Sequence, residues 1–200
     1  MTNTREARSE ILEYGALRIG FHWHRDRFAH TIGFVRDRRL IPVMASMEGG
    51  GEESWPPSPP LQELEIAEGP TGPNALLVGS AGGSHWSLVV DRDPHAELFR
   101  IDVACRFMNL PTADSPQDAQ RDSLHSHYRT MFCAEPLPGH PGAIAVGQLV
   151  VEPHSNTTTA IPQKMAGAGR EVGDLCLAPR IPNVASGTIR WQYTVGLRKP

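Results

Sequence analysis

Lysine is scarce in this sequence, and so is positive charge overall. Lys164 and Lys199 are its two lysines, and arginine supplies the remaining basic residues. The formal net charge is -3 at neutral pH. A chain with this balance lacks the overall positive field that recruits nucleic acid or an anionic membrane surface. We therefore expect neither nucleic acid nor a membrane as a partner.

Long apolar runs and paired cysteines are also missing. No segment approaches the roughly 20 consecutive apolar residues of a membrane-spanning helix, and residues 1–13 are too polar for a secretory signal. Cys105, Cys133 and Cys176 are odd in number, far apart and outside any Cys-x-x-Cys pair, which argues against a disulfide framework. These features predict a cytoplasmic protein with three reduced cysteines that act as small apolar core residues.

Glycine and proline, by contrast, are plentiful. The chain has 19 glycines and 18 prolines, which leave few uninterrupted stretches for helices. Its apolar content of 40% is enough to form a core. A large β sandwich or barrel can hold 200 residues in one unit. We therefore predict a single domain over residues 1–200.

The apolar residues alternate with polar ones, as in strands buried on one face. Residues 17–24 and 28–34 alternate in phase and predict a hairpin, and residues 85–90 and 99–106 predict a second one. Further strands are expected near residues 40–47, 61–66, 75–78, 143–152, 174–178 and 187–198. Residues 1–14 are predicted to be a terminal appendage with a short helix over 4–14. The expected fold is an antiparallel β sandwich or barrel with long Pro/Gly-rich loops.

The second hairpin suggests a catalytic pair. If its turn places Asp91 opposite Ala96, then Trp86 lies opposite Ile101 and His85 lies opposite Asp102. A carboxylate beside an imidazole can orient it and raise its pKa, as in a general base. The alternative is an ordinary cross-strand ion pair.

Two His-x-His pairs suggest a metal site. His22 and His24 form one pair, and His125 and His127 form the other. On a strand, residues two apart point to the same face, so each pair can offer two imidazoles to zinc, iron or manganese. The alternative is a solvated strand face for the first pair and a loop for the second. His30 shares a face with apolar residues, which predicts a hydrogen-bonded interior histidine.

Charge is unevenly distributed along the chain. Residues 16–39 contain six arginines and two aspartates, whereas residues 41–75 contain six glutamates and no basic residue. Such segments are expected to face each other or a partner, including a second copy of the chain.

Three runs carry a family resemblance: residues 23–30 (WHRDRFAH), 81–87 (AGGSHWS) and 102–106 (DVACR). They resemble segments of an uncharacterised bacterial family of the planctomycete type. The resemblance implies a specialised domain and assigns no activity, cofactor, partner or functional residue.

Three hypotheses for function follow. The first is a β domain that binds a small ligand or a protein partner, since the chain has many strands and no complete catalytic motif. The second is a metal-dependent hydrolase or oxygenase with ligands among His22, His24, His125 and His127. The third is a structural or assembly protein whose acidic and basic segments join subunits.

Overall fold

The structure is a computed structural model that describes residues 9–49, 57–107, 124–160, 173–180 and 187–198. These residues contain strands and turns but no helix, and hence no helix that could cross a membrane. Fifteen strands are present: β1 (Ser9–Tyr14), β2 (Leu17–His24), β3 (Arg27–Arg36), β4 (Arg39–Ser46), β5 (Glu63–Gly69), β6 (Gly72–Ala81), β7 (Ser84–Arg92), β8 (Leu98–Phe107), β9 (Ser126–Thr130), β10 (Ala134–Pro136), β11 (Ile144–Val146), β12 (Leu149–Pro153), β13 (Thr157–Ala160), β14 (Gly173–Pro179) and β15 (Thr188–Leu197).

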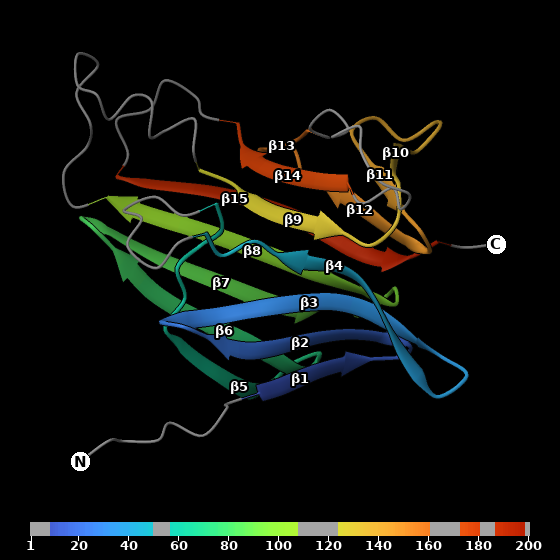
Figure 1. Cartoon of the computed structure of the whole chain (residues 1–200), viewed down its shortest axis with the longest axis horizontal. Coiled ribbons are helices and arrows are strands. Elements are labelled where there is room, and N and C mark those ends of the chain that lie inside the picture. The colour runs from blue at the N-terminus through green and yellow to red at the C-terminus, as the bar shows by residue number, and fades with distance from the viewer. Residues whose placement is uncertain (1–8, 50–56, 108–123, 161–172, 181–186, 199–200) are drawn as a thin grey trace.

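The strands form two antiparallel sheets that pack as a sandwich (Figure 1). Sheet A has seven strands in the order β1-β2-β3-β4-β9-β14-β13. Sheet B has eight strands in the order β10-β11-β12-β15-β8-β7-β6-β5. The prediction of an antiparallel all-β fold is confirmed, and the two sheets stay separate instead of closing into a barrel.

Alternation along the strands builds the core between the sheets. In β2 the side chains of Leu17, Ile19 and Phe21 are buried, and in β15 those of Trp191, Tyr193 and Val195 are buried. Their neighbours in sequence point to the outer faces, because successive strand residues face opposite sides. The two predicted hairpins are confirmed as β2–β3 and β7–β8.

The predicted helix near the N-terminus is wrong for residues 9–14. These residues form β1, which pairs along its whole length with β2. Leu12 is buried in the core, so this segment belongs to sheet A and is not an appendage. The alternation of apolar and polar residues in this segment is short, and the residues before it favour a helix. Pairing with β2 outweighs this local preference for helix. The rest of the predicted helix, residues 4–8, lies outside the described residues.

A proline-rich segment after residue 56 ties the sheets together at one end. The Leu61 carbonyl accepts a hydrogen bond from the Phe28 N–H of sheet A at 2.7 Å, and the Gln62 N–H donates to the Val78 carbonyl of sheet B at 2.8 Å. Gly79 permits this crossing, because a Cβ there would collide with the Pro60 carbonyl. The segment therefore crosses from one sheet to the other.

Polar side chains also cross the core. The Tyr128 hydroxyl on β9 lies 2.8 Å from His30 Nε2 on β3 and 2.6 Å from the Tyr193 hydroxyl on β15. All three side chains are buried. The prediction that His30 is an interior histidine is confirmed, although its Nδ1 atom has no hydrogen-bond partner among the described residues.

Glu48, which follows β4, is a second buried ionisable residue. It is 8% exposed, and its Oε1 atom accepts a hydrogen bond from Ser46 Oγ at 2.5 Å. Burial raises the pKa of Glu48 to about 7, and Asp26 adds to this, against the opposing effects of Ser46 and Arg27. Burial likewise lowers the pKa of His30 to about 4, with a further contribution from His22. Both side chains therefore favour their neutral forms.

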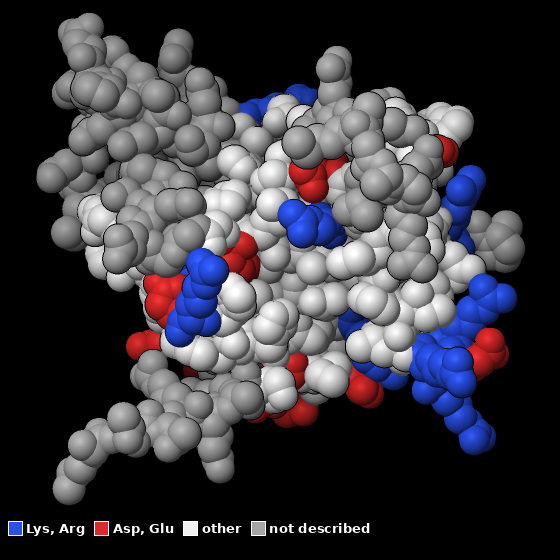
Figure 2. All heavy atoms as spheres, in the orientation of Figure 1, with Lys and Arg blue, Asp and Glu red and all other residues white. Residues whose placement is uncertain are grey.

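Charged side chains gather on separate parts of the surface. Figure 2 shows a basic group at its lower right corner, where Figure 1 draws the β3–β4 hairpin. Arg36, Arg38 and Arg39 are exposed there, and Glu63 and Glu65 are exposed on β5. Three arginines of the basic segment, residues 16–39, form ion pairs among the described residues. Their partners are acidic residues close by in sequence: Arg18 pairs with Glu13, Arg27 with Asp26 and Arg36 with Asp37.

Candidate metal centre

Strands β9 and β14 lie side by side in sheet A and bring together three side chains of types that can ligate a metal. His127 on β9 is directly opposite Cys176 on β14 in the antiparallel register. His125 precedes His127 by two residues, so it belongs to the same face. Ser126 and Tyr128 point into the core, which leaves the two histidines and Cys176 on the outer face of the sheet.

The three side chains form a compact cluster. One ligand atom from each of His125, His127 and Cys176 lies within 4.8 Å of the other two, and all three residues are half-buried. The two imidazole rings have centroids 5.6 Å apart. Zinc bonds of about 2.1 Å to nitrogen and 2.3 Å to sulfur place tetrahedral ligand atoms about 3.5 Å apart. Small rotations of these side chains therefore suffice to surround one ion.

The main chain of His127 is held firmly. Its N–H donates to the Pro57 carbonyl at 3.1 Å, and its carbonyl accepts from the Met47 N–H at 2.8 Å and from Ser58 Oγ at 3.0 Å. These bonds come from the end of β4 and from the proline-rich segment. The imidazole is therefore attached to a rigid position, as a preorganised binding site requires.

One nitrogen of His127 needs a partner. Nε2 is buried and has no hydrogen-bond partner among the described residues. The nearest acidic group is Asp174, whose Oδ2 atom lies 3.7 Å from this nitrogen. Buried polar atoms are nearly always satisfied by protein, water or an ion, so this atom marks a place where a ligand would be stabilising.

The thiol of Cys176 lies in an environment that opposes its ionisation. Burial raises its pKa to about 11, and the negative charge of Asp174 adds to this effect. A bound cation would lower the pKa of this thiol, because a thiol that coordinates a metal loses its proton. Asp174 then becomes an attractive neighbour, since it contributes negative charge beside the ion.

Of the two predicted His-x-His pairs, the structure places one, His125 and His127, beside a third potential metal ligand, Cys176. His22 and His24 lie on the outer side of β2 and are exposed. Two strands, β3 and β4, separate β2 from β9 in sheet A. Three strand spacings amount to about 14 Å. The two pairs therefore cannot share one ion, and His125 and His127 find their third ligand on β14 instead.

The hairpin register that would pair His85 with Asp102 is wrong. In β7–β8, His85 lies opposite Arg106 and Asp102 lies opposite Val89, while Trp86 pairs with Cys105. Asp102 Oδ2 instead accepts a hydrogen bond from Gln192 Nε2 at 2.7 Å. The proposed general base therefore loses its orienting carboxylate.

The cause of the register shift is the turn. The Asp93 carboxylate accepts hydrogen bonds from the N–H groups of His95 and Ala96, at 2.8 and 3.1 Å. The Asp93 N–H donates to the Leu98 carbonyl at 3.1 Å. An aspartate turn of this kind closes the loop later than the predicted register assumes. The shift is an even number of residues, so the inward-facing side chains stay the same.

Sequence reasoning missed Cys176 and Asp174 as site residues. The prediction places Cys176 among small core residues, whereas it is half-buried on the outer face. One signal was present, because Asp174 and Cys176 are two apart on a predicted strand, the same spacing as His125 and His127. The pairing of two strands almost fifty residues apart could not be read from that spacing.

Comparison of the chain with protein-family models, curated proteins and solved structures finds no match. This outcome agrees with the resemblance to an uncharacterised family, and it leaves the site itself as the source of functional inference.

Proposed function

We propose that this protein binds a divalent transition-metal ion, with zinc as its preferred metal, through His125, His127 and Cys176. The observation that carries the proposal is the cluster of their ligand atoms within 4.8 Å on adjacent strands. The buried Nε2 atom of His127, which has no hydrogen-bond partner among the described residues, supports it.

The donor set selects among metals. Imidazole and thiolate suit zinc and copper, whereas magnesium and calcium prefer oxygen ligands. The neighbouring Asp174 carboxylate favours zinc, which accepts an oxygen as its fourth ligand. A copper electron-transfer site would instead use a weak axial thioether. Zinc is therefore the metal that fits these four side chains.

Three protein ligands leave a fourth position at a tetrahedral ion. In catalytic zinc sites that position holds a water of lowered pKa, and in structural sites a fourth protein ligand closes it. If water occupies the fourth position, the reaction class that follows is metal-dependent hydrolysis. If Asp174 is the fourth ligand, the site is structural, and the ion links β9 to β14.

The first test is zinc titration of metal-free protein, followed by calorimetry, with elemental analysis of the purified chain. We expect one zinc per chain, and loss of that zinc in each of H125A, H127A and C176S. The double variant H22A/H24A is the matched control, because it removes the other His-x-His pair of the same sheet and should keep the zinc. Absence of zinc binding, or binding that C176S leaves unchanged, would contradict the proposal.

Asp174 provides a second, graded prediction. D174N is expected to weaken zinc binding by about 10- to 100-fold, the usual effect of removing a carboxylate beside a metal. The control is D102N, which removes a carboxylate from the outer face of sheet B and should leave zinc affinity unchanged. Competition with a zinc chelator measures both. Equal zinc affinities of D174N and the wild type would exclude Asp174 from the centre.

A further inference from the structure

A cavity of about 700 Å³ lies on the outer face of sheet B. Its floor consists of outward-facing residues of β12, β15 and β8, where Val150 lies opposite Gly196 and Gly196 lies opposite Leu98. One wall is the loop between β10 and β11, with Leu137, Pro138 and His140, and the other is the loop between β7 and β8, with Ala96 and Glu97. We call this cavity the sheet B trough.

The trough owes part of its depth to Gly196. This residue occupies the middle of the floor, where a side chain would otherwise stand between Val150 and Leu98. A Cβ atom built there would lie 3.2 Å from Leu98 Cβ. Any larger side chain at position 196 would therefore fill the space above the floor. The apolar floor and the volume suit a small organic molecule.

Two carboxylates border the trough. Glu152 lies opposite Thr194, and its Oε1 atom is 3.6 Å from His140 Nδ1. Glu97 comes from the opposite wall, and its Oε1 atom accepts a hydrogen bond from the Ala16 N–H at 2.5 Å. Among the described residues, neither carboxylate forms an ion pair with an arginine or lysine.

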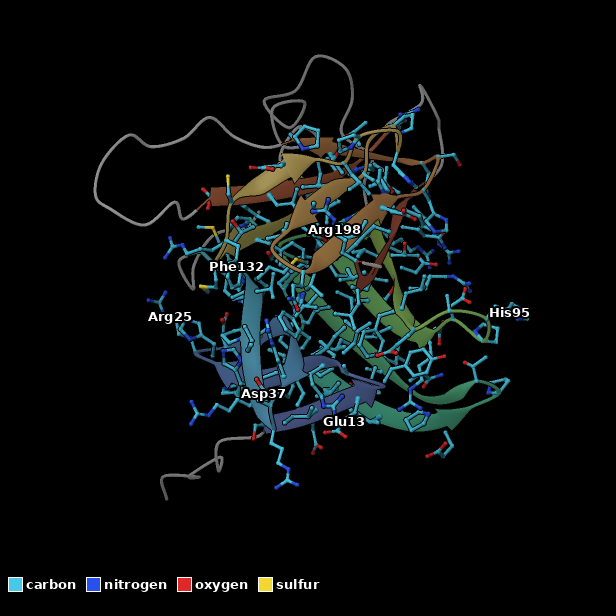
Figure 3. The ribbon with its side chains drawn as sticks, turned by 90° about the vertical axis from the view of Figure 1, so that its right-hand side faces the viewer. Glu13, Arg25, Asp37, His95, Phe132 and Arg198 are labelled. Carbon is cyan, nitrogen blue, oxygen red and sulfur yellow. The ribbon has the colours of Figure 1, made fainter. Side chains whose placement is uncertain are left out.

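Of the arginines and lysines that the structure describes, Arg198 is the one that lines the trough, and it is exposed. Figure 3 looks at this end of the molecule, with Arg198 near the middle of the view and His95, from the β7–β8 loop, at the right. Arg100 lies opposite Thr194 on the same face, but it is paired with the Asp93 carboxylate at 2.9 Å. Glu152 and Glu97 therefore outnumber the remaining guanidinium of Arg198, and the net charge of the acidic and arginine side chains that border the trough is negative. A cationic group is therefore favoured over an anionic one.

We propose that the sheet B trough binds a small organic cation, with its apolar body on the Val150–Gly196–Leu98 floor and its ammonium group beside Glu152. The Thr194 hydroxyl lies next to Glu152 in the register and offers a further acceptor for the ammonium protons. The trough and the metal centre occupy outer faces of different sheets. The inference goes beyond metal binding and does not depend on it.

The test uses three probes that share one apolar body: 4-phenylbutylamine, 4-phenylbutan-1-ol and 4-phenylbutyrate. Chemical shift changes in amide spectra of the full chain measure the affinity of each. We expect the amine to bind most tightly and the carboxylate most weakly, with shifts centred on β12, β15 and β8. E152Q should reduce the amine affinity about three- to fivefold, toward that of the alcohol.

Two further variants make the test specific. G196V should abolish binding of all three probes, while circular dichroism and the melting temperature report whether its fold is kept. E63Q removes an exposed carboxylate from β5, at the far edge of the same sheet, and should leave amine affinity unchanged. Tightest binding by the carboxylate, equal binding of the three probes, or no binding by any of them would overturn the proposal. An amine affinity that E152Q does not change would overturn the role of Glu152.

Discussion

Replacement of Trp191 by alanine is expected to lower the free energy of unfolding by about 3–5 kcal/mol, the usual range for removing a buried tryptophan. Trp191 is fully buried in β15, and its ring packs edge-on against Trp86 with centroids 6.1 Å apart. Its Nε1–H donates to Ser126 Oγ on β9 at 3.1 Å, so the side chain also links sheet B to sheet A. Urea denaturation measures the effect.

Two control variants separate the contributions to this loss. S126A removes the hydrogen-bond acceptor alone and should cost about 1 kcal/mol. W23A removes a tryptophan that is only half-buried in β2 and should cost clearly less than W191A. If W191A and W23A were equally destabilising, the assignment of Trp191 to the centre of the core would be wrong.

The second large prediction concerns pH. The pKa of Glu48 is raised to about 7 in the folded protein from 4.5, so the folded state binds the proton more tightly than the unfolded state. Its contribution to stability is therefore fully present below pH 4.5 and is lost as the pH rises to about 7. The loss amounts to about 3 kcal/mol. E48Q keeps an acceptor for Ser46 and removes this loss.

His30 acts in the opposite direction. Its pKa is lowered from 6.5 to about 4, so its contribution is present above pH 6.5 and is lost as the pH falls to about 4. In the wild type, the free energy of unfolding loses the Glu48 contribution and gains the His30 contribution as the pH rises from 4.5 to 6.5, so the two effects nearly cancel. Each single variant is expected to expose the slope of the other residue.

The measurement is the free energy of unfolding from urea titrations between pH 4 and 8. The value for E48Q minus that for the wild type should rise by about 3 kcal/mol between pH 4.5 and 7. The same difference for H30Q should fall by a similar amount between pH 4 and 6.5. A difference for E48Q that does not change with pH would show that Glu48 is not buried as described.

The alternation of apolar and polar residues was enough to predict the two hairpins, but it was not enough to predict which residues lie opposite each other in them. Alternation in residues 17–24 and 28–34 corresponds to β2 and β3, because each strand has one face in the core. The β7–β8 hairpin was also predicted with the right inward faces, yet its register was wrong because Asp93 forms hydrogen bonds within the turn. Alternation specifies a face, and the turn specifies the register.

The sequence by itself determined the class of fold, the inward-facing residues and the two His-x-His pairs as candidate ligands. Only the tertiary structure decided which pair meets a third ligand, because β9 and β14 are joined by main-chain hydrogen bonds across a long stretch of chain. It also placed Cys176 opposite His127 and Glu48 inside the protein. Alternation depends on near neighbours alone, whereas a binding site depends on strand order and register, which are set by the packing of the whole sandwich.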